Sequence, residues 1–289
     1  MTSTATNDAI LRAACAQAGL HSSTASVLRQ HAASVWLLRD VDIVVRIGRS
    51  AERAERAVRI THWLHEQGFP AVQPIDIDQP ITIDNAAVTF WKHYPQHGRP
   101  APGAAALGGL LRRLHHVPQP PVTLETYVPL SALGAVLESD TQLSEGDRSW
   151  LIDRRMRLLR TYQQLQSELG EGFIHGDAYP GNALWDGDTV RLGDWDEVAR
   201  GPRELDLVST HQGERFGRSA AKRQAFTDAY GWDVTVWAGY STLRDIRELH
   251  TLGAYLARAG RGDATAFAEL RYRVATLRAG DRHSLWHAT

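Results

Sequence analysis

The sequence predicts an α+β fold with two lobes: a small N-terminal lobe built on an antiparallel β-sheet with one main helix, and a larger, mainly helical C-terminal lobe. Three observations lead to this fold class. β-rich runs are concentrated in the first 95 residues, a Gly- and Pro-rich stretch follows at residues 96–103, and helical periodicity dominates the rest of the chain. We therefore expect a first domain at residues 1–95 and a second at residues 96–289, with a hinge at the start of the second.

Helix and strand signals alternate in the N-terminal lobe. Between Asn7 and Ala18 apolar residues recur at helical spacing, and Gly19 then stops the helix. A second helix begins after Ser50, a residue type that caps helix N-termini, and ends at Gly68. β-rich runs separated by turn residues predict strands at residues 26–30, 34–40 and 41–47 before the second helix, and two more strands within residues 81–94 after it.

Helical periodicity accounts for most of the C-terminal lobe. One long helix starts near Ser144, because Ser144 and Asp147 have the spacing of a capping box. Others are expected at residues 105–117, 219–230, 243–259 and 264–278. Between these helices we expect one β-hairpin, in which Asp186-Gly187 forms the turn between residues 183–185 and 189–192.

Two motifs rich in acids flank this hairpin. The first, FIHGDAYPGN, ends at Asn182, and the second, LGDWDEVARGPRELDL, begins at residue 192. By folding the chain back, the hairpin is expected to bring Asp177, Asn182 and Asp194 close together. Their carboxylate and amide oxygens suit Mg²⁺, and the five-residue interval from Asp177 to Asn182 is that of the protein-kinase catalytic loop, so the cluster indicates phosphoryl transfer. Asp206, later in the second motif, is expected to cap a helix or to pair with an arginine such as Arg203.

The combination HGDAYPGN…DWDEVARGPRELDL resembles the signature of the aminoglycoside phosphotransferase family, relatives of choline kinase with a bilobal protein-kinase-like fold. The resemblance extends over nearly the whole chain. It implies that Asp177 is the catalytic base and that Asn182 and Asp194 hold the metal ions. It also implies that His175 braces the loop, and it leaves Asp196 open between a metal or substrate contact and a structural role.

The nucleotide site departs from the family pattern in two ways. Arg46 stands where kinases usually carry the phosphate-binding lysine, which a guanidinium can replace because it binds phosphate through a planar fork. No glycine-rich loop is visible, so Ser34 and backbone amides are expected to cover the phosphates. Glu55 is the expected partner of Arg46, with Glu52 one turn before it, although both acids can instead form i,i+4 pairs on the helix surface. The resemblance implies nucleotide contacts by Ser34, Arg46 and Glu55, and adenine contacts near Trp91, His93 and Tyr94.

Composition limits the partners and the location. Lys plus Arg number 32 and Asp plus Glu 33, a balance that argues against a general nucleic-acid binder. No run approaches 18 apolar residues, so no membrane span is expected, and the N-terminus lacks the pattern of a signal peptide, so the expected location is cytoplasmic. Cys15, the single cysteine, is expected to be a small buried hydrophobe. The sequence leaves monomer and homodimer open.

Together these features predict a phosphotransferase that uses ATP or GTP, Mg²⁺ and a small hydroxylated acceptor. The family resemblance implies an aminoglycoside or a related amino sugar as acceptor, and with it antibiotic resistance. Such a polycation would need an acidic pocket, for which the C-terminal lobe offers Asp228, Asp233, Asp245 and Glu248. Three alternatives stay open: a kinase-like nucleotide-binding module without catalysis, a small-metabolite kinase for a choline-like or sugar acceptor, and a metal-dependent phosphohydrolase.

Overall fold

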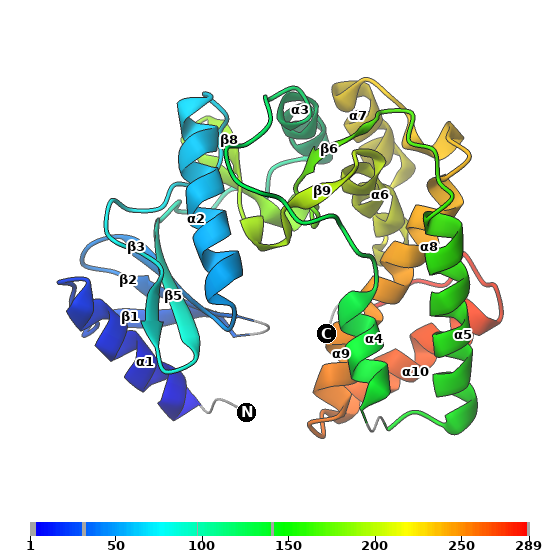
Figure 1. Cartoon of the computed structure of the whole chain (residues 1–289), viewed down its shortest axis with the longest axis horizontal. Coiled ribbons are helices and arrows are strands. Elements are labelled where there is room, and N and C mark those ends of the chain that lie inside the picture. Colours follow the sequence, from blue (N-terminus) through cyan, green and yellow to red (C-terminus); the bar gives the residue numbers. More distant parts are fainter. Residues whose placement is uncertain (1–3, 31–32, 97, 140–141, 288–289) are drawn as a thin grey trace. The chain divides into compact units, whose positions relative to one another are not determined.

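The computed structural model describes residues 4–30, 33–96, 98–139 and 142–287. Internal contacts divide the chain into two units, whose elements are labelled in Figure 1. Unit 1 contains Met1–Pro102, His116–Leu124 and Pro180–Val198, and unit 2 contains Gly103–His115, Glu125–Tyr179 and Ala199–Thr289. The division expected from the sequence places residues 96–102, 116–124 and 180–198 in the second domain instead.

Unit 1 is built on a five-stranded antiparallel sheet with the strand order β1-β2-β3-β5-β4. Its strands are β1 (Ala25–Gln30), β2 (Ser34–Leu38), β3 (Ile43–Gly48), β4 (Ile81–Ile83) and β5 (Ala86–Lys92). All five were expected from the sequence. Because side chains alternate along a strand, Val45 and Ile47 of β3 enter the core, whereas Arg46 between them points to the opposite face of the sheet.

One face of this sheet is covered by α1 (Thr4–Gln17), drawn in dark blue beside the strands in Figure 1. Buried side chains of α1, among them Leu11 and Cys15, join the core formed by β2, β3 and β5. Burial raises the pKa of the Cys15 thiol to about 11, so this cysteine is a protonated, apolar side chain, as its sequence context predicts.

The main helix of unit 1 is α2 (Ala51–Glu66), which follows β3. The hydroxyl oxygen of Ser50 caps it by accepting a hydrogen bond from the backbone N–H of Arg53 at 3.2 Å. Gly68, at φ +69°, ends the turn that follows the helix. Both boundary signals were therefore read correctly from the sequence.

The expected hairpin forms and belongs to unit 1. It consists of β7 (Ala183–Asp186) and β8 (Thr189–Leu192), with the short 3₁₀ helices η1 (Pro180–Asn182) before it and η2 (Trp195–Glu197) after it. The backbone N–H of Leu192 donates to Pro70 at 2.9 Å, and its carbonyl accepts from Val72 at 2.9 Å. These bonds join the hairpin to the segment after α2 and explain its assignment to unit 1.

Helices make up most of unit 2. They are α3 (Ala104–Leu114), α4 (Ser131–Glu138), α5 (Glu145–Tyr162), α6 (Glu204–Gln212), α7 (Ala220–Tyr230), α8 (Tyr240–His250), α9 (Leu252–Ala259) and α10 (Ala264–Arg278), with the 3₁₀ helices η3 (Gly213–Phe216) and η4 (Val234–Val236). The predictions of α3, α5, α7 and α10 are confirmed, whereas α4 and α6 were not expected. No helix among the described residues is long and apolar enough to cross a membrane.

The prediction of a single helix at residues 243–259 is wrong. The helix is interrupted at Thr251, which separates α8 from α9. The Thr251 hydroxyl donates to the carbonyl of Glu248 at 2.8 Å. A side chain that bonds to the backbone of the preceding turn competes with the helical ladder and favours a bend or an end.

Two short strands of unit 2 were also not expected. They are β6 (Glu171–Ile174) and β9 (Ala199–Pro202), which pair antiparallel. Each has four residues including a glycine, so neither shows the alternation that marks a longer strand. The pair matters for function because β6 leads directly into the His-Gly-Asp segment.

Close packing of α3 on α7 generates a first prediction. A Cβ atom at Gly108 would lie 2.4 Å from the carbonyl oxygen of Phe226 on α7, so Gly108→Ala should lower the free energy of unfolding by about 1–3 kcal/mol. At Gly109 nothing lies within 4 Å, and Gly109→Ala should raise that free energy by about 0.5–1 kcal/mol, because alanine favours helix interiors. Denaturant unfolding measures the free energy of unfolding of the two variants. Equal changes in Gly108→Ala and Gly109→Ala would contradict the close approach of α3 and α7.

Candidate active site

The His-Gly-Asp segment forms a buried turn immediately after β6. His175 is fully buried, and its ring Nδ1 accepts a hydrogen bond from the backbone N–H of Asp177 at 3.3 Å. Gly176 has a φ of +82°, a left-handed conformation that glycine adopts without strain. The chain therefore turns sharply between the strand and Asp177.

A buried carboxylate from α6 holds this turn. Asp206 is fully buried, and its two oxygens accept the backbone N–H groups of His175 at 2.8 Å and Gly176 at 2.9 Å. His115, which follows α3, places Nε2 at 3.1 Å from the same carboxylate. The expectation that Asp206 caps a helix or pairs with Arg203 is wrong, because Asp206 turns toward the loop and Arg203 donates to a backbone carbonyl of another segment.

The other ring nitrogen of His115 contacts Tyr230 of α7. Nδ1 of His115 lies 2.8 Å from the hydroxyl oxygen of Tyr230. Burial alone would raise the pKa of Asp206, but the hydrogen bond and charge of His115, together with the charge and the backbone bond of His175, lower it below its ordinary value. Burial raises the pKa of Tyr230, so its hydroxyl stays protonated. Thus α3, α6 and α7 all support the backbone that carries Asp177.

Asp177 itself pairs with an arginine that was not predicted as a site residue. Nη1 of Arg247, on α8, lies 2.7 Å from Oδ1 of Asp177. The two side chains are 19% and 27% exposed, so the pair is largely shielded from water. No motif marks Arg247 in the sequence, since the contact depends on how α8 packs against α6.

The two expected metal ligands lie together in unit 1. Asn182 is buried at the end of η1, and Asp194 follows β8. The N–H of Gly193 donates to the carbonyl of Asn182 at 2.8 Å, so the hairpin holds the two segments side by side. Asp194 has a φ of +63°, which is uncommon for a non-glycine residue. Asp177 belongs to unit 2, so its proximity to these two residues stays a prediction.

Arg46 binds the Asp-Trp-Asp segment of unit 1. Nη1 of Arg46 donates to Oδ1 of Asp196 at 2.6 Å, and Nη2 lies 3.4 Å from Oδ1 of Asp194. Arg29 of β1 lies 3.7 Å from the other oxygen of Asp194. Burial opposes the charge of Arg46, but the carboxylates of Asp196 and Asp194 outweigh it and raise the pKa of the guanidinium. Trp195, between the two acids, is buried and donates its indole N–H to a backbone carbonyl of β8, which fixes the segment.

The expected pair between Arg46 and Glu55 does not form. Glu55 is exposed and lies 3.8 Å from Arg59, and Glu52 lies 3.7 Å from Arg56. Both are i,i+4 pairs along α2, and both glutamates point to solvent. The reason is the phase of the helix, whose inward face carries small and apolar side chains at this level. A nucleotide contact by Glu55 stays a prediction.

Ser34, expected to cover the phosphates, is buried and accepts a hydrogen bond from the side-chain amide of Asn7 on α1 at 2.8 Å. It is therefore bonded within the N-terminal core. The adjoining residues 31 and 32 lie outside the described part of the chain. The role of this turn at a nucleotide stays a prediction.

The aromatic residues expected near the adenine also have partners within unit 1. Trp91 is buried and donates its indole N–H to Thr89 at 2.8 Å. Nδ1 of His93 lies 2.6 Å from Asp42, and the backbone N–H of His93 donates to the Asp42 carbonyl at 3.1 Å. The hydroxyl of Tyr94 accepts a backbone N–H at 3.2 Å. Their contacts with a nucleotide base stay a prediction.

The donors in unit 1 fit the chemistry of Mg²⁺. Mg²⁺ in phosphotransferases usually takes one or two protein oxygens and completes its shell with water and phosphate, and Asp194 and Asn182 offer a carboxylate and an amide oxygen. Across the described ranges, no group of three or more His, Cys, Asp and Glu side chains is arranged to hold a metal ion by itself.

Sequence comparison connects this geometry to known proteins. The profile of a family described as "Phosphotransferase enzyme family" (APH) matches residues 18–249 of the chain. No curated protein matches the chain.

Several solved structures share the fold. The amicoumacin kinase hAmiN in complex with AMP-PNP, Ca²⁺ and Ami has a TM-score of 0.73 at 13% identity, covering 97% of this chain and 95% of that chain. A choline/ethanolamine kinase family protein from Mesorhizobium loti has a TM-score of 0.67 at 16% identity, with coverages of 95% and 94%. Spectinomycin phosphotransferase in complex with ADP and spectinomycin has a TM-score of 0.59 at 18% identity, with coverages of 86% and 88%. At these identities the likeness establishes the fold, and it confirms the predicted kinase-like α+β class.

The buried carboxylate gives a pH-dependent prediction. Asp206→Asn should lower the free energy of unfolding by about 3–5 kcal/mol at pH 7, because it removes a buried carboxylate that accepts two backbone N–H groups and contacts His115. Since the pKa of Asp206 is lowered in the folded chain, its contribution is present above the ordinary aspartate pKa of about 3.9 and is lost as the pH falls through the folded value. Denaturant unfolding from pH 7 to pH 3 should show the gap between wild type and variant closing at the acid end. Asp228→Asn, at an exposed position on α7, is the control, and a gap that does not change with pH would contradict the assignment.

The Arg46 pair gives a second prediction. Asp196→Asn should lower the free energy of unfolding by about 1–2 kcal/mol, because it removes the charge from a half-buried hydrogen bond. Glu55→Gln, which removes an exposed helix pair, should change it by less than about 0.5 kcal/mol. Denaturant unfolding of both variants checks the ranking. If Glu55→Gln lowers the free energy of unfolding more than Asp196→Asn does, Glu55 rather than Asp196 is the main partner of Arg46.

Proposed function

The chain belongs to the phosphotransferase enzyme family (APH), and on this basis we propose that it transfers the γ-phosphate of ATP or GTP to a hydroxyl group of a small molecule. The observation that carries the proposal is the loop of Asp177. Its spacing to Asn182 is that of a kinase catalytic loop, and its backbone is held by the buried carboxylate of Asp206. A carboxylate on a fixed backbone can orient an acceptor hydroxyl at little entropic cost.

In the proposed reaction the oxygen of the acceptor hydroxyl attacks the γ-phosphorus of the nucleotide. The new oxygen–phosphorus bond forms as the bond from the γ-phosphorus to the oxygen bridging to the β-phosphate breaks, and a nucleoside diphosphate leaves. Asp177 orients the hydroxyl and accepts its proton. Arg46 would bind phosphate oxygens through its guanidinium, which Asp196 orients. Asn182 and Asp194 would hold Mg²⁺, which neutralises charge on the phosphate oxygens.

For the acceptor, we carry forward an aminoglycoside-like amino sugar as the class that the signature implies. Phosphorylation of such an antibiotic would confer resistance to it. A choline-like amine or a sugar is the alternative, and the solved structures with this fold include a choline/ethanolamine kinase family protein as well as kinases of antibiotics. A screen of aminoglycosides, choline-like amines and sugars with ATP and with GTP, read by the mass of the product, separates these classes.

A nucleotide-binding module without catalysis is the second candidate. It is favoured by the contacts of Asp194, whose carboxylate lies beside the guanidinium groups of Arg46 and Arg29. Those cations compete with a metal ion for the same oxygens. Thermal-shift titration with nucleotide, with and without Mg²⁺, measures binding, and the acceptor screen measures turnover. Binding without turnover over the whole panel would favour the module.

The role of Asp177 is tested by Asp177→Asn. On the acceptor found in the screen, kcat should fall by about 10²–10⁴-fold, because the variant cannot accept the hydroxyl proton. The nucleotide Kd should stay close to that of the wild type, and the variant should stay folded at the assay temperature, with a lower melting temperature because Arg247 loses its charged partner. Asp153→Asn, at an exposed position on α5, should keep full turnover. If Asp177→Asn also keeps it, Asp177 is not the base.

A further inference from the structure

The partner of the proposed base carries information about the acceptor. Arg247 reaches from α8 to Asp177, with 2.7 Å between Nη1 and Oδ1. An acceptor whose hydroxyl approaches Asp177 must therefore also approach a guanidinium group. This inference rests on the proposed function, because it takes Asp177 as the group that receives the acceptor hydroxyl.

Arg247 has unused hydrogen-bonding capacity. Its Nε–H is buried and has no acceptor among the described residues. A buried donor without an acceptor costs free energy that a bound acceptor atom would recover. Arginine also presents its N–H groups as a planar fork that matches the two oxygens of a carboxylate.

A small cavity of unit 2 adjoins this guanidinium. It is lined by Gly176 of the His-Gly-Asp segment, by Ser209 of α6, by Arg247, and otherwise by apolar or aromatic side chains. No carboxylate lines it. The cavity therefore offers an apolar wall, the hydroxyl-bearing side chains of Ser209 and Tyr127, and one cation beside Asp177, a combination that does not suit a polyamine.

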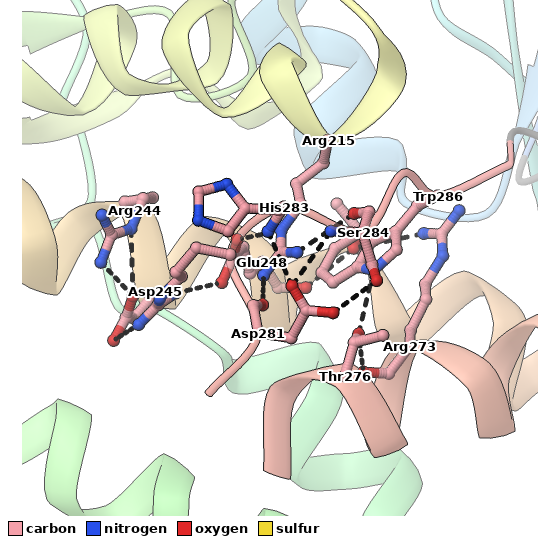
Figure 2. A network of polar contacts seen from close by, with 12 residues as sticks. Arg215, Arg244, Asp245, Glu248, Arg273, Thr276, Asp281, His283, Ser284 and Trp286 are labelled. Carbon is pink, nitrogen blue, oxygen red and sulfur yellow. Dashed lines mark hydrogen bonds and ion pairs between the residues drawn. The ribbon is translucent and has the colours of Figure 1, made fainter. Parts of the chain in front are cut away.

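The acids that could serve a polyamine are already neutralised by arginines. Figure 2 shows this network, in which Asp245 and Glu248 of α8 lie among guanidinium groups. Nε of Arg215 donates to Glu248 at 2.7 Å, and Nη1 of Arg282 lies 2.8 Å from Glu248 and 2.9 Å from Asp245. Arg244 lies 3.1 Å from Asp245. Both carboxylates are buried, so a ligand cannot recruit them without leaving arginines unpaired.

The other two acids proposed for such a pocket are also engaged. Asp233 caps η4 by accepting the backbone N–H of Thr235 at 2.9 Å. Asp228 lies on α7 and accepts a hydrogen bond from Gln224 at 2.8 Å. Neither lines the cavity beside Arg247.

From these contacts we propose that Arg247 binds a carboxylate of the acceptor, so that the acceptor is a hydroxylated carboxylic acid in place of the polycationic amino sugar that the signature implies. The carboxylate takes the Nε–H group of Arg247 while the acceptor hydroxyl faces Asp177. An ammonium group in the same place would lie against the guanidinium of Arg247, and the nearby carboxylate of Asp177 is already paired with that guanidinium. Arg247 is thus a specificity-determining residue.

Matched acceptors that differ in one group test this assignment. The full-length chain is incubated with ATP, Mg²⁺ and three sets: glucuronate, glucose and 6-amino-6-deoxyglucose; gluconate, sorbitol and glucamine; and 4-hydroxybutanoate, butane-1,4-diol and 4-aminobutan-1-ol. Phosphorylated product is read by mass, and kcat and KM are measured for each active member. We expect the carboxylate to have the highest kcat/KM of its set. A neutral or amine member that exceeds its carboxylate would overturn the proposal.

Substitutions of Arg247 separate a specificity role from a general one. Arg247→Gln should raise the KM for an active carboxylate by about tenfold to a hundredfold, because a charge-assisted hydrogen bond is lost, and should leave the KM for the nucleotide near the wild-type value. Arg247→Lys should restore part of the affinity. Arg244→Gln, on the same helix but paired with Asp245, is the matched control and should leave the acceptor KM unchanged. If Arg247→Gln changes kcat and the KM for the nucleotide but not the KM for the acceptor, the proposal is overturned, because Arg247 then acts at the transferred phosphate.

A binding measurement decides the case in which no member is phosphorylated. Thermal stabilisation by gluconate and by glucamine is compared in the wild type and in Arg247→Gln. Stabilisation of the wild type by gluconate, lost in Arg247→Gln, supports the carboxylate site; equal responses of the two proteins overturn it. Two further measurements report on the proposed function itself. They are the binding of ATP with Mg²⁺ and an ATP hydrolysis that is lost in Asp177→Asn. Failure of the carboxylate site is thereby distinguished from failure of the phosphotransfer assignment.

Discussion

One buried carboxylate holds the His-Gly-Asp segment in place. Asp206 satisfies two backbone N–H groups that the turn after β6 would otherwise bury without partners, and it bonds to His115 at the end of α3. A carboxylate without water is stable only when several donors surround it. The segment of Asp177 therefore cannot move independently of α6 and α3. Because His115 also bonds to Tyr230, the packing of α3 on α7 becomes part of the geometry that presents the proposed base.

Unit 1 contains a second charge pair with a comparable effect. The guanidinium of Arg46 joins the central sheet to the Asp-Trp-Asp segment through Asp196, and the buried ring of Trp195 fixes that segment against the hairpin. One short motif thus supplies both a proposed metal ligand, Asp194, and the group that orients the proposed phosphate-binding cation. Because Asp196 is the carboxylate partner of Arg46, no glutamate of α2 is needed for that role. The exposed position of Glu55 agrees with this.

Local signals in the sequence predicted much of this fold. Strand runs, the Ser50 cap and the Asp-Gly turn depend on neighbouring residues, and the structure has each of them. The contacts of Asp206 and Arg247 could not be predicted in the same way, since each joins helices that are distant in the sequence. The partner of Arg46 depended on the phase of α2, which places Glu55 outward, and sequence spacing alone did not resolve it. The interruption between α8 and α9 falls at Thr251, and neither the hydrophobic periodicity nor a proline marks it in the sequence.

The charge around α8 depends on contacts between side chains that the composition does not reveal. Acids and bases are nearly equal in number over the whole chain, and the acids near α8 suggested a site for a polycation. In the folded unit those acids are buried beneath arginines, and Arg215, itself buried, has Glu248 as its carboxylate partner. A ligand that drew Glu248 away would leave that guanidinium without compensation in an apolar interior, at a cost of several kcal/mol that no single new ion pair is expected to repay. The network consequently behaves as a fixed support in which arginines outnumber carboxylates, and the cation beside Asp177 is Arg247. In the proposed carboxylate site, recognition of the acceptor depends on this arginine, which the sequence does not distinguish from its many other arginines.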